Sequence, residues 1–306
     1  VVDDELESVG DFRERARQWL ASAMPPLGDG WNDRSDARRE IERGLQRRLW
    51  DGGFAGICFP AAYGGLGLTV EHQRAFTAES APYDMPFSLN VPTLGILAAT
   101  LIDFGTHEQK LRHLPAILRG EELWVQFLSE PSGGSDLAGC LTRADRDGDV
   151  FILNGAKTWS SSAYLSDYAL CLARTDWDVP KHRGLSMFIV KIHQPGVTVE
   201  QIRQVDGSME FCGEFFDDVA LPATDGVLAS HVHPWPPADE VADRRVDLPV
   251  VGAALGHLVD ARRPHLGPVL EHRLEERRDA VAVELGRLVP GGGVVRRRRR
   301  GAGARH

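Results

Sequence analysis

Between residues 1 and 122, apolar side chains recur every three to four positions, which is the period of a helix with one buried face. Thr69 can cap one of these helices, with His72 three residues later in place of the usual capping-box acid. The range 88–104 is apolar on nearly every face, so we expect it in the interior. The pattern predicts an all-α domain over residues 1–122, with helices over 11–24, 33–50, 88–104 and 106–118 and one that starts after Thr69.

The pattern changes near Leu123, where short apolar runs with turn signals between them replace the helical period. Asn154-Gly155 is typical of a tight hairpin turn between two such runs. No helical segments alternate with the runs, which argues against a parallel dinucleotide-binding sheet. An α+β fold is therefore predicted, with a small antiparallel barrel or sandwich over residues 123–228. Its predicted strands are 123–129, 150–154, 168–174, 185–193, 197–202 and 214–221.

Residues 229–306 differ in composition from the rest of the chain. They contain 14 Arg, no Lys and 10 acidic residues, whereas residues 1–228 contain 21 basic and 34 acidic residues. They also lack Phe, Tyr, Ile and Met, and only 270–288 has a helical pattern. Because those missing residue types have AT-rich codons, we interpret this largely irregular tail as a frame-shifted, GC-rich reading frame. The alternative is a natural basic, low-complexity tail. In both cases we expect residues 290–306 to pack against nothing.

Overall composition narrows the class of protein. The chain has 306 residues, 42% of them apolar, and a net charge of −9, which suits a globular protein and disfavours nucleic-acid binding. The longest apolar run, 92–102, is shorter than the roughly 20 residues that cross a bilayer, so no membrane span is expected. Four widely spaced cysteines without a CxxC pair, together with an acidic N-terminal segment, favour a cytoplasmic protein.

Standard catalytic motifs do not match. There is no P-loop, no HExxH and no GxGxxG after a strand. His231 and His233 have the spacing of metal ligands, but they lie in the atypical tail, and no metal site is predicted.

Two segments remain as candidates for a binding site. Ser129-Glu130-Pro131-Ser132-Gly133-Gly134-Ser135-Asp136 follows a strand and offers backbone N–H groups and hydroxyls to an anion or a carbonyl. Asn154-Gly155-Ala156-Lys157-Thr158-Trp159-Ser160-Ser161-Ser162 places a tryptophan, which can stack on a flat ring, beside three hydroxyls. Each segment also has a simpler interpretation, a turn for the first and a core tryptophan for the second.

In this order and spacing, the two segments resemble the acyl-CoA dehydrogenase family, flavoenzymes that carry T-E-P-x-x-G-S-D and later N-G-x-K-x-W-I-T. Here the segments read S-E-P-S-G-G-S-D and N-G-A-K-T-W-S-S. Other family stretches are matched in the same order by 53–67, 104–120, 170–175 and 215–222. The resemblance covers roughly residues 5–228. It implies FAD-dependent α,β-dehydrogenation of an acyl-CoA thioester.

The resemblance also implies which residues bind. Ser129 and Ser161 take the places of two family threonines that hydrogen-bond the flavin ring, and Leu128 and Trp159 take places along that ring. Ser135 takes the place of a serine that approaches the pantetheine of acyl-CoA. Glu130, Lys157 and Asp136 are interpreted as structural. The cofactor-binding set that the resemblance implies is Gln126, Leu128, Ser129, Trp159, Ser160 and Ser161, with Gln126 in place of a common family aromatic.

No residue is assigned as the catalytic base. In the family this base is usually a glutamate on a C-terminal helical domain, which has no recognisable counterpart in this sequence. The tail carries Glu271, Glu275, Glu276 and Glu284, but their surroundings match no family motif. The family also implies an electron-transferring flavoprotein as partner and a homo- or hetero-oligomer. We therefore expect an acyl-CoA dehydrogenase that is incomplete in this chain.

Two alternatives remain open. The chain could be a non-catalytic, flavin- or acyl-CoA-binding subunit of a hetero-oligomeric acyl-CoA dehydrogenase, with the base on its partner. It could instead be a helical and β-sheet interaction protein without a cofactor. The ordered set of matched segments disfavours this last interpretation.

Overall fold

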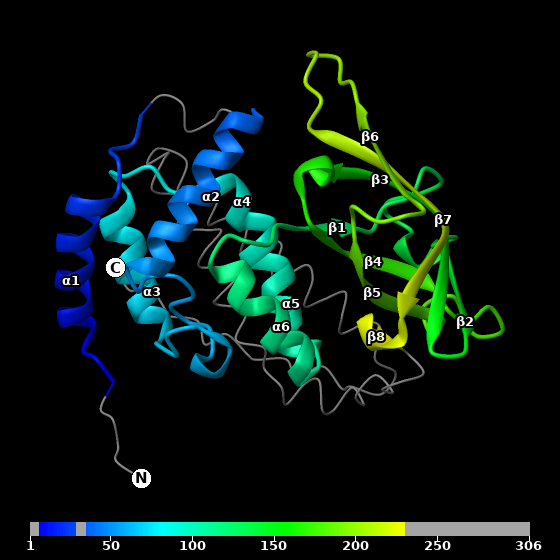
Figure 1. Ribbon diagram of the computed structural model, residues 1–306, viewed down its shortest axis with the longest axis horizontal. Coiled ribbons are helices and arrows are strands. Elements are labelled where there is room, and N and C mark those ends of the chain that lie inside the picture. Colours follow the sequence, from blue (N-terminus) through cyan, green and yellow to red (C-terminus); the bar gives the residue numbers. More distant parts are fainter. Residues whose placement is uncertain (1–5, 29–34, 230–306) are drawn as a thin grey trace, which may run out of the picture. The chain divides into compact units, whose positions relative to one another are not determined.

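The computed structural model describes residues 6–28 and 35–229 (Figure 1). Within them, helices come first along the chain and strands follow, which confirms the predicted α+β class. None of the helices in these two ranges is long and apolar enough to cross a membrane. The helical pattern at 270–288, the expectation for 290–306 and the four tail glutamates lie outside the described residues.

The helical region starts from capped, amphipathic helices. Helix α1 buries Phe12, Ala16 and Leu20, which recur at intervals of four residues and so share one face. Ser8 caps α1, and its hydroxyl accepts a hydrogen bond from the amide of Asp11 at 3.1 Å. The helices of the region are α1 (Val9–Ala23), α2 (Asp36–Asp51), α3 (Val70–Ser80), α4 (Phe87–Pro92), α5 (Ala99–Phe104) and α6 (His107–Leu118).

The cap of α3 confirms the role expected for Thr69 and gives His72 the place of an acid. The amide of Thr69 donates to His72 Nδ1 at 3.3 Å. Because Nδ1 is then the acceptor, His72 Nε2 carries the hydrogen and donates it to the carbonyl of Glu7 at 2.8 Å. His72 is therefore a buried structural residue that joins the segment before α1 to the start of α3.

The range 88–104 is not the single helix that we predicted. A π-helical segment, Thr93–Ala98, separates α4 from α5. Pro92, inside the helix, has no N–H to donate, so the regular α ladder is interrupted there. Thr93 has its own partners, because its hydroxyl lies 3.1 Å from the amide and 3.2 Å from the carbonyl of Trp124. The segment thus connects the helices to the first strand.

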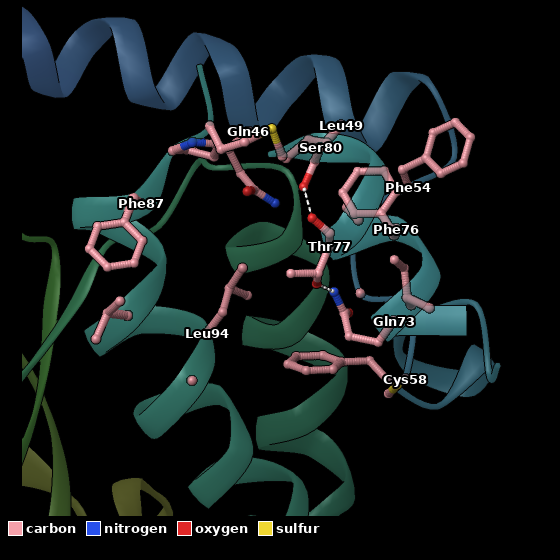
Figure 2. Close-up of a pocket in the computed structure, with 18 residues that line it drawn as sticks. Gln46, Leu49, Phe54, Cys58, Gln73, Phe76, Thr77, Ser80, Phe87 and Leu94 are labelled. Atoms are coloured by element: carbon pink, nitrogen blue, oxygen red, sulfur yellow. Dashed lines mark hydrogen bonds between the residues drawn. The ribbon is translucent and has the colours of Figure 1, made fainter. Parts of the chain in front are cut away.

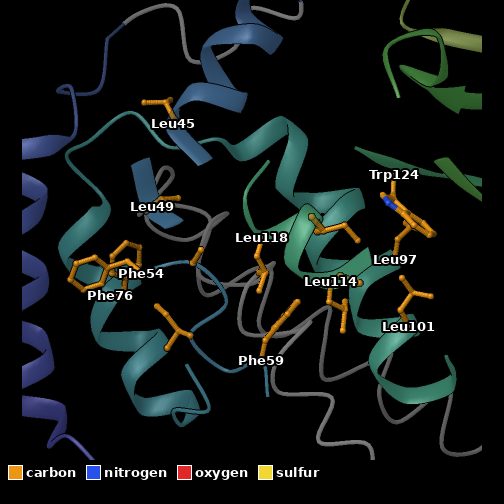
Figure 3. Close-up of a cluster of buried hydrophobic side chains, with 14 of the residues drawn as sticks. Leu45, Leu49, Phe54, Phe59, Phe76, Leu97, Leu101, Leu114, Leu118 and Trp124 are labelled. Atoms are coloured by element: carbon orange, nitrogen blue, oxygen red, sulfur yellow. The ribbon is translucent and has the colours of Figure 1, made fainter. Parts of the chain in front are cut away.

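One apolar core extends from the helices into the sheet. Phe54 stacks on Phe76 with ring centroids 5.3 Å apart, and the same cluster contains Trp124 with Leu97 and Leu101 (Figure 3). Leu170 and Ile189, both on strands, belong to this cluster as well. A second cluster lies within the sheet region and contains Phe127, Leu153, Phe188 and Val219.

The sheet has eight strands and is mostly antiparallel, with the order β6-β7-β3-β2-β4-β5-β8. Strand β1 pairs with β4, and that pairing is parallel, as is the short β2–β4 contact at Arg143 and Arg174. The sheet region is therefore mostly antiparallel, as predicted, and its parallel contacts are confined to β4. The strands are β1 (Trp124–Phe127), β2 (Arg143–Asp147), β3 (Val150–Ser161), β4 (Tyr168–Arg174), β5 (Leu185–Lys191), β6 (Val197–Ile202), β7 (Phe211–Pro222) and β8 (Gly226–Ala229).

The predicted hairpin turn at Asn154-Gly155 is also wrong. Strand β3 continues through both residues to Ser161, and the chain turns earlier, around Gly148, which has a φ of 58°. Asn154 instead makes two hydrogen bonds across to Asp218 of β7, at 2.9 and 3.0 Å. Gly155 has a φ of 144°, and a Cβ there would lie 2.7 Å from Thr142 Cα, so the close approach of a neighbouring backbone requires glycine here. The register also shifts between Leu153 and Gly155, and the extra residue of this bulge lies on β7, at Asp217 and Asp218.

Replacing Ser8 with Ala is expected to lower the free energy of unfolding by about 1 kcal/mol, because the amide of Asp11 loses its cap. The same change at Ser22, which is exposed in the last turn of α1, serves as the control. Since Ala is the better helix former, Ser22→Ala is expected to be neutral or slightly stabilising. Urea unfolding of both variants is the measurement, and equal effects at the two positions would contradict the capping role.

Candidate functional site

The two candidate segments lie side by side in the sheet region. The end of β1 and the residues that follow it run along β3, and hydrogen bonds join the two segments at three successive points. These are Ser160 Oγ to the carbonyl of Gln126 at 3.0 Å, Lys157 Nζ to the carbonyl of Leu128 at 3.2 Å, and the amide of Thr158 to the carbonyl of Ser129 at 2.9 Å. The structure thereby brings Gln126, Leu128 and Ser129 next to Trp159 and Ser160.

Trp159 projects outward because β3 has a bulge at this residue. Its backbone has a φ of 68°, and the register with β7 shifts between Thr158 and Ser160. The extra residue leaves the Trp159 side chain 58% exposed, although Ser160 next to it and Lys157 two residues before it are buried. The interpretation of Trp159 as a core residue is therefore wrong. A large flat ring is presented at the surface, edge-on to Phe211 at 6.0 Å between centroids.

The other predicted site residues differ in exposure. Ser161 and Ser135 are exposed, and Ser129 is half-buried, with its hydroxyl facing Gly134. Ser160 is buried, and its hydroxyl contacts Gln126 and Glu214 in the interior. Ser135 lies in a loop whose turn is closed by two hydrogen bonds of 3.0 Å between the backbones of Glu130 and Gly133.

Glu130 and Lys157 form a buried ion pair that holds this loop to β3. Lys157 Nζ lies 2.8 Å from Glu130 Oε1, and Glu130 also accepts hydrogen bonds from the amides of Leu141 and Thr142 at 2.7 and 2.9 Å. Burial disfavours the charged carboxylate, but these hydrogen bonds outweigh burial and lower the pKa of Glu130 to about 2. Their geometry supports the structural role expected for both residues.

Arg174 is a loop-organising residue that the sequence analysis did not single out. Its guanidinium donates to the carbonyls of Cys140, Ala138 and Lys181 at 3.1, 2.6 and 3.0 Å. These bonds hold the segment 137–141, of which Leu137, Gly139, Cys140 and Leu141 line a small pocket of about 140 Å³. Asp136 also lines that pocket and pairs with Lys181 at 2.6 Å, and both side chains are exposed. Its geometry is that of a surface ion pair rather than of a catalytic carboxylate.

Glu214 is a second residue that the sequence analysis missed. It lies on β7 and is 0% exposed, and burial raises its pKa to about 8. Among the described residues, its Oε1 has no hydrogen-bond partner. Strand alternation provided a signal, because it places Glu214 on the same face as the buried Phe216.

The helical region contains an apolar pocket of about 190 Å³ between α2, α3 and the α4–π segment (Figure 2). Polar groups at its wall bond within the fold, since Gln73 Nε2 donates to Thr77 Oγ1 at 3.3 Å and Ser80 Oγ donates to the carbonyl of Thr77 at 3.1 Å. None of the residues predicted to bind cofactor or substrate lines this pocket. Within residues 6–28 and 35–229, no cluster of His, Cys, Asp and Glu suits a metal ion.

Comparison with known proteins matches both regions. The family model for the N-terminal domain of acyl-CoA dehydrogenase matches residues 7–121, and the model for the middle domain matches residues 126–219. The acyl-CoA dehydrogenase IpdE1 of Mycobacterium tuberculosis is 39% identical over 223 residues, which are 71% of this chain and 58% of IpdE1. The chain therefore spans less than two thirds of this relative.

Solved structures agree in fold. The ChsE4-ChsE5 complex from Mycobacterium tuberculosis matches with a TM-score of 0.58 and 26% identity, over 84% of this chain and 62% of the matched chain. A glutaryl-CoA dehydrogenase from Mycobacterium smegmatis in complex with FADH2 matches with a TM-score of 0.55 and 27% identity, over 74% of this chain and 57% of that chain. Motifs, fold and relatives agree, and this chain belongs to the acyl-CoA dehydrogenase family.

Proposed function

We propose that residues 6–229 form the flavin- and acyl-CoA-binding part of an enzyme that desaturates an acyl-CoA thioester between Cα and Cβ, with FAD as cofactor. The observation that carries this proposal is the outward-facing Trp159, held by a strand bulge beside the Ser129 loop in a member of this family. The relative solved with FADH2 supports flavin as the class of cofactor.

The side chains of this region fit a flat, conjugated ring with heteroatoms. Trp159 offers an exposed flat face, and Leu128 lies on the adjoining backbone. Ser129 and Ser161 offer hydroxyls that can donate to ring oxygen and nitrogen atoms. Gln126 and Ser160 support this surface from behind through their mutual hydrogen bond.

When bound, FAD supplies the acceptor for the hydride that leaves Cβ. The residues of this chain position the reactants: Trp159 and Leu128 exclude water from one side of the ring, and Ser129 and Ser161 hold its polar edge. Ser135 is proposed to contact the pantetheine arm. No described residue is assigned as the base that removes the Cα proton, and we propose that another part of the enzyme or a partner supplies it.

A non-catalytic subunit of a hetero-oligomer is the second candidate, and the match to the ChsE4-ChsE5 complex favours it. Turnover of an acyl-CoA panel with an artificial electron acceptor separates the two. We expect little or no turnover from this chain alone. Recovery of turnover on addition of a homologous subunit would favour the hetero-oligomer. In both cases, electron-transferring flavoprotein is the proposed physiological electron acceptor.

Replacing Trp159 with Ala is expected to weaken flavin binding about fivefold, since stacking between aromatic rings contributes roughly 1 kcal/mol. Titration of the purified chain with FAD, followed by quenching of flavin fluorescence, gives the dissociation constant. Trp177→Ala is the control, because Trp177 is similarly exposed, at 53%, but packs on Arg174 outside the proposed ring surface. An unchanged dissociation constant for Trp159→Ala, or equal losses in both variants, would argue against this ring site.

A further inference from the structure

The buried Glu214 lies directly behind the surface proposed to bind flavin. On one side its register partner is Lys157 of β3, and on the other side it is Val199 of β6. Ser160, whose hydroxyl contacts Glu214, is the residue between Trp159 and Ser161. A single side chain therefore separates Glu214 from the residues that would face the ring.

Lys157 does not neutralise Glu214, although the two residues are register partners. An ammonium group has three hydrogens to donate. Lys157 Nζ lies 3.2 Å from the carbonyl of Leu128, 2.8 Å from Glu130 Oε1 and 3.4 Å from Cys140 Sγ. These three acceptors use all of its donors, so Glu214 is a buried carboxyl without an ion-pair partner.

Hydrogen counting at Ser160 indicates which form of Glu214 the fold requires. Ser160 Oγ lies 3.0 Å from the carbonyl oxygen of Gln126 and 3.2 Å from Glu214 Oε2. A hydroxyl has one hydrogen, and the carbonyl can only accept, so Ser160 donates to Gln126. The contact with Glu214 is then a hydrogen bond only if Glu214 is protonated and donates to Ser160 Oγ.

Ionisation of Glu214 would break this arrangement. A carboxylate only accepts, so it would compete with Gln126 for the single hydrogen of Ser160. The Gln126 carbonyl would then lose its donor, and a negative charge would lie behind the ring surface. The other titratable groups that interact with Glu214 are Lys157 of β3, Cys171 of β4 and Cys212 of β7. Burial raises the pKa of both thiols, which keeps them neutral, and a thiol cannot supply a positive charge to compensate a carboxylate.

We propose that Glu214 is a positioning residue for the cofactor: its carboxyl hydrogen holds Ser160 against the Gln126 carbonyl, and so fixes the Trp159 bulge in the form that binds the ring. Loss of this proton to solvent releases Ser160 and weakens cofactor binding. The inference rests on the proposed flavin site. The expected pH dependence comes from the carboxyl of Glu214. A neutral hydrogen-bond donor at position 214 would hold Ser160 in the same way, but its effect would not depend on pH.

The test is the FAD dissociation constant of the purified chain between pH 6 and pH 9.5. We expect the affinity of the unaltered chain to fall roughly tenfold across the titration of Glu214, the loss that follows from one hydrogen bond. Glu214→Gln, whose amide can donate to Ser160, should keep the low-pH affinity throughout. Glu200→Gln on the exposed face of β6 is the matched control and should retain the unaltered profile. A flat profile for the unaltered chain, or the same decline in Glu214→Gln, would overturn the proposal.

A measurement without cofactor separates this inference from the proposed function. The fluorescence of Trp159, taken as the difference between the unaltered chain and Trp159→Phe, should titrate with pH and should stop titrating in Glu214→Gln. If FAD does not bind at any pH but this titration is seen, the proposed function fails while Glu214 still controls the bulge. If Trp159 fluorescence does not change with pH, the positioning role is wrong. Ser160→Ala removes the connecting hydroxyl and leaves Glu214 itself unchanged, so it should also abolish the titration of Trp159 fluorescence.

Discussion

Replacing Lys157 with Met is expected to lower the free energy of unfolding by about 3–5 kcal/mol, because it removes one partner of a buried ion pair. Lys157 is 1% exposed and Glu130 is 7% exposed, so water cannot replace the lost ammonium. The Leu128 carbonyl and Cys140 Sγ lose their contacts with Lys157 Nζ in the same change. Chemical unfolding at pH 7, monitored by circular dichroism, measures the difference.

Lys181→Met is the matched control for this experiment. Lys181 forms the same kind of pair with Asp136, but both side chains are exposed, so the expected change is within about 1 kcal/mol. Similar losses for Lys157→Met and Lys181→Met would show that burial does not decide the contribution of these pairs.

The Glu130–Lys157 pair should also affect the free energy of unfolding at acid pH. Because the pKa of Glu130 is lowered to about 2 in the folded chain, its ionised form stabilises the fold above its ordinary pKa of 4.5. This contribution is lost as the pH falls from about 4.5 towards 2. In Lys157→Met the loss between those pH values should be smaller, since the strongest hydrogen bond to the carboxylate has been removed.

Glu214 should make the free energy of unfolding depend on pH in the opposite direction to Glu130, with an effect of comparable size. In the folded chain its pKa is raised to about 8, whereas the unfolded chain has the ordinary value of 4.5. Between these values the folded chain holds a proton that the unfolded chain has released, so the free energy of unfolding falls as the pH rises. The full difference is of the order of 5 kcal/mol, at 1.36 kcal/mol for each pKa unit, and it is reached near pH 8.

Glu214→Gln should remove this decline. At pH 4.5 the variant and the unaltered chain should have similar stability, and at pH 8 the variant should be more stable by several kcal/mol. Urea unfolding at pH 4.5, 6 and 8 measures the difference, with Glu200→Gln as a control that should follow the unaltered chain. A constant difference between Glu214→Gln and the unaltered chain at all three pH values would show that Glu214 does not titrate in this way.

The helical period predicted most of the first region, because each helix buries one face and its own sequence records that face. The prediction of one regular helix over 88–104 was wrong because of Pro92, which interrupts the backbone hydrogen bonds of the helix. The apolar pattern of the sequence does not reveal this irregularity. The strand β2 was missed for a related reason. Its sequence, Arg143–Asp147, is polar and only Ala144 is buried, so no alternating apolar pattern marks it as a strand. It forms a strand because it pairs with β3.

The candidate site was predicted through family positions and not through local patterns. Local rules placed a turn at Asn154-Gly155, whereas β3 continues through both residues and the bulge there lies on the opposite strand, at Asp217 and Asp218 of β7. The outward position of Trp159 depends on a second bulge, with positive φ, that no residue type at this position would signal. Glu214 could have been found from strand alternation, but its lack of an ion-pair partner depends on the three acceptors that already bind Lys157 Nζ.

The core shared by helices and sheet has a consequence for how this chain unfolds. The two family models meet near residue 122, which suggests two separable modules. Trp124, Leu170 and Ile189 nevertheless pack in one cluster with helical residues, so a cut at this boundary would uncover apolar surface on both pieces. The two modules should therefore melt in a single cooperative transition. A substitution in α5 that weakens the packing of Leu101 should also destabilise β1, because Trp124 of β1 lies in the same cluster. For the same reason, the sequences of the two modules are expected to change together.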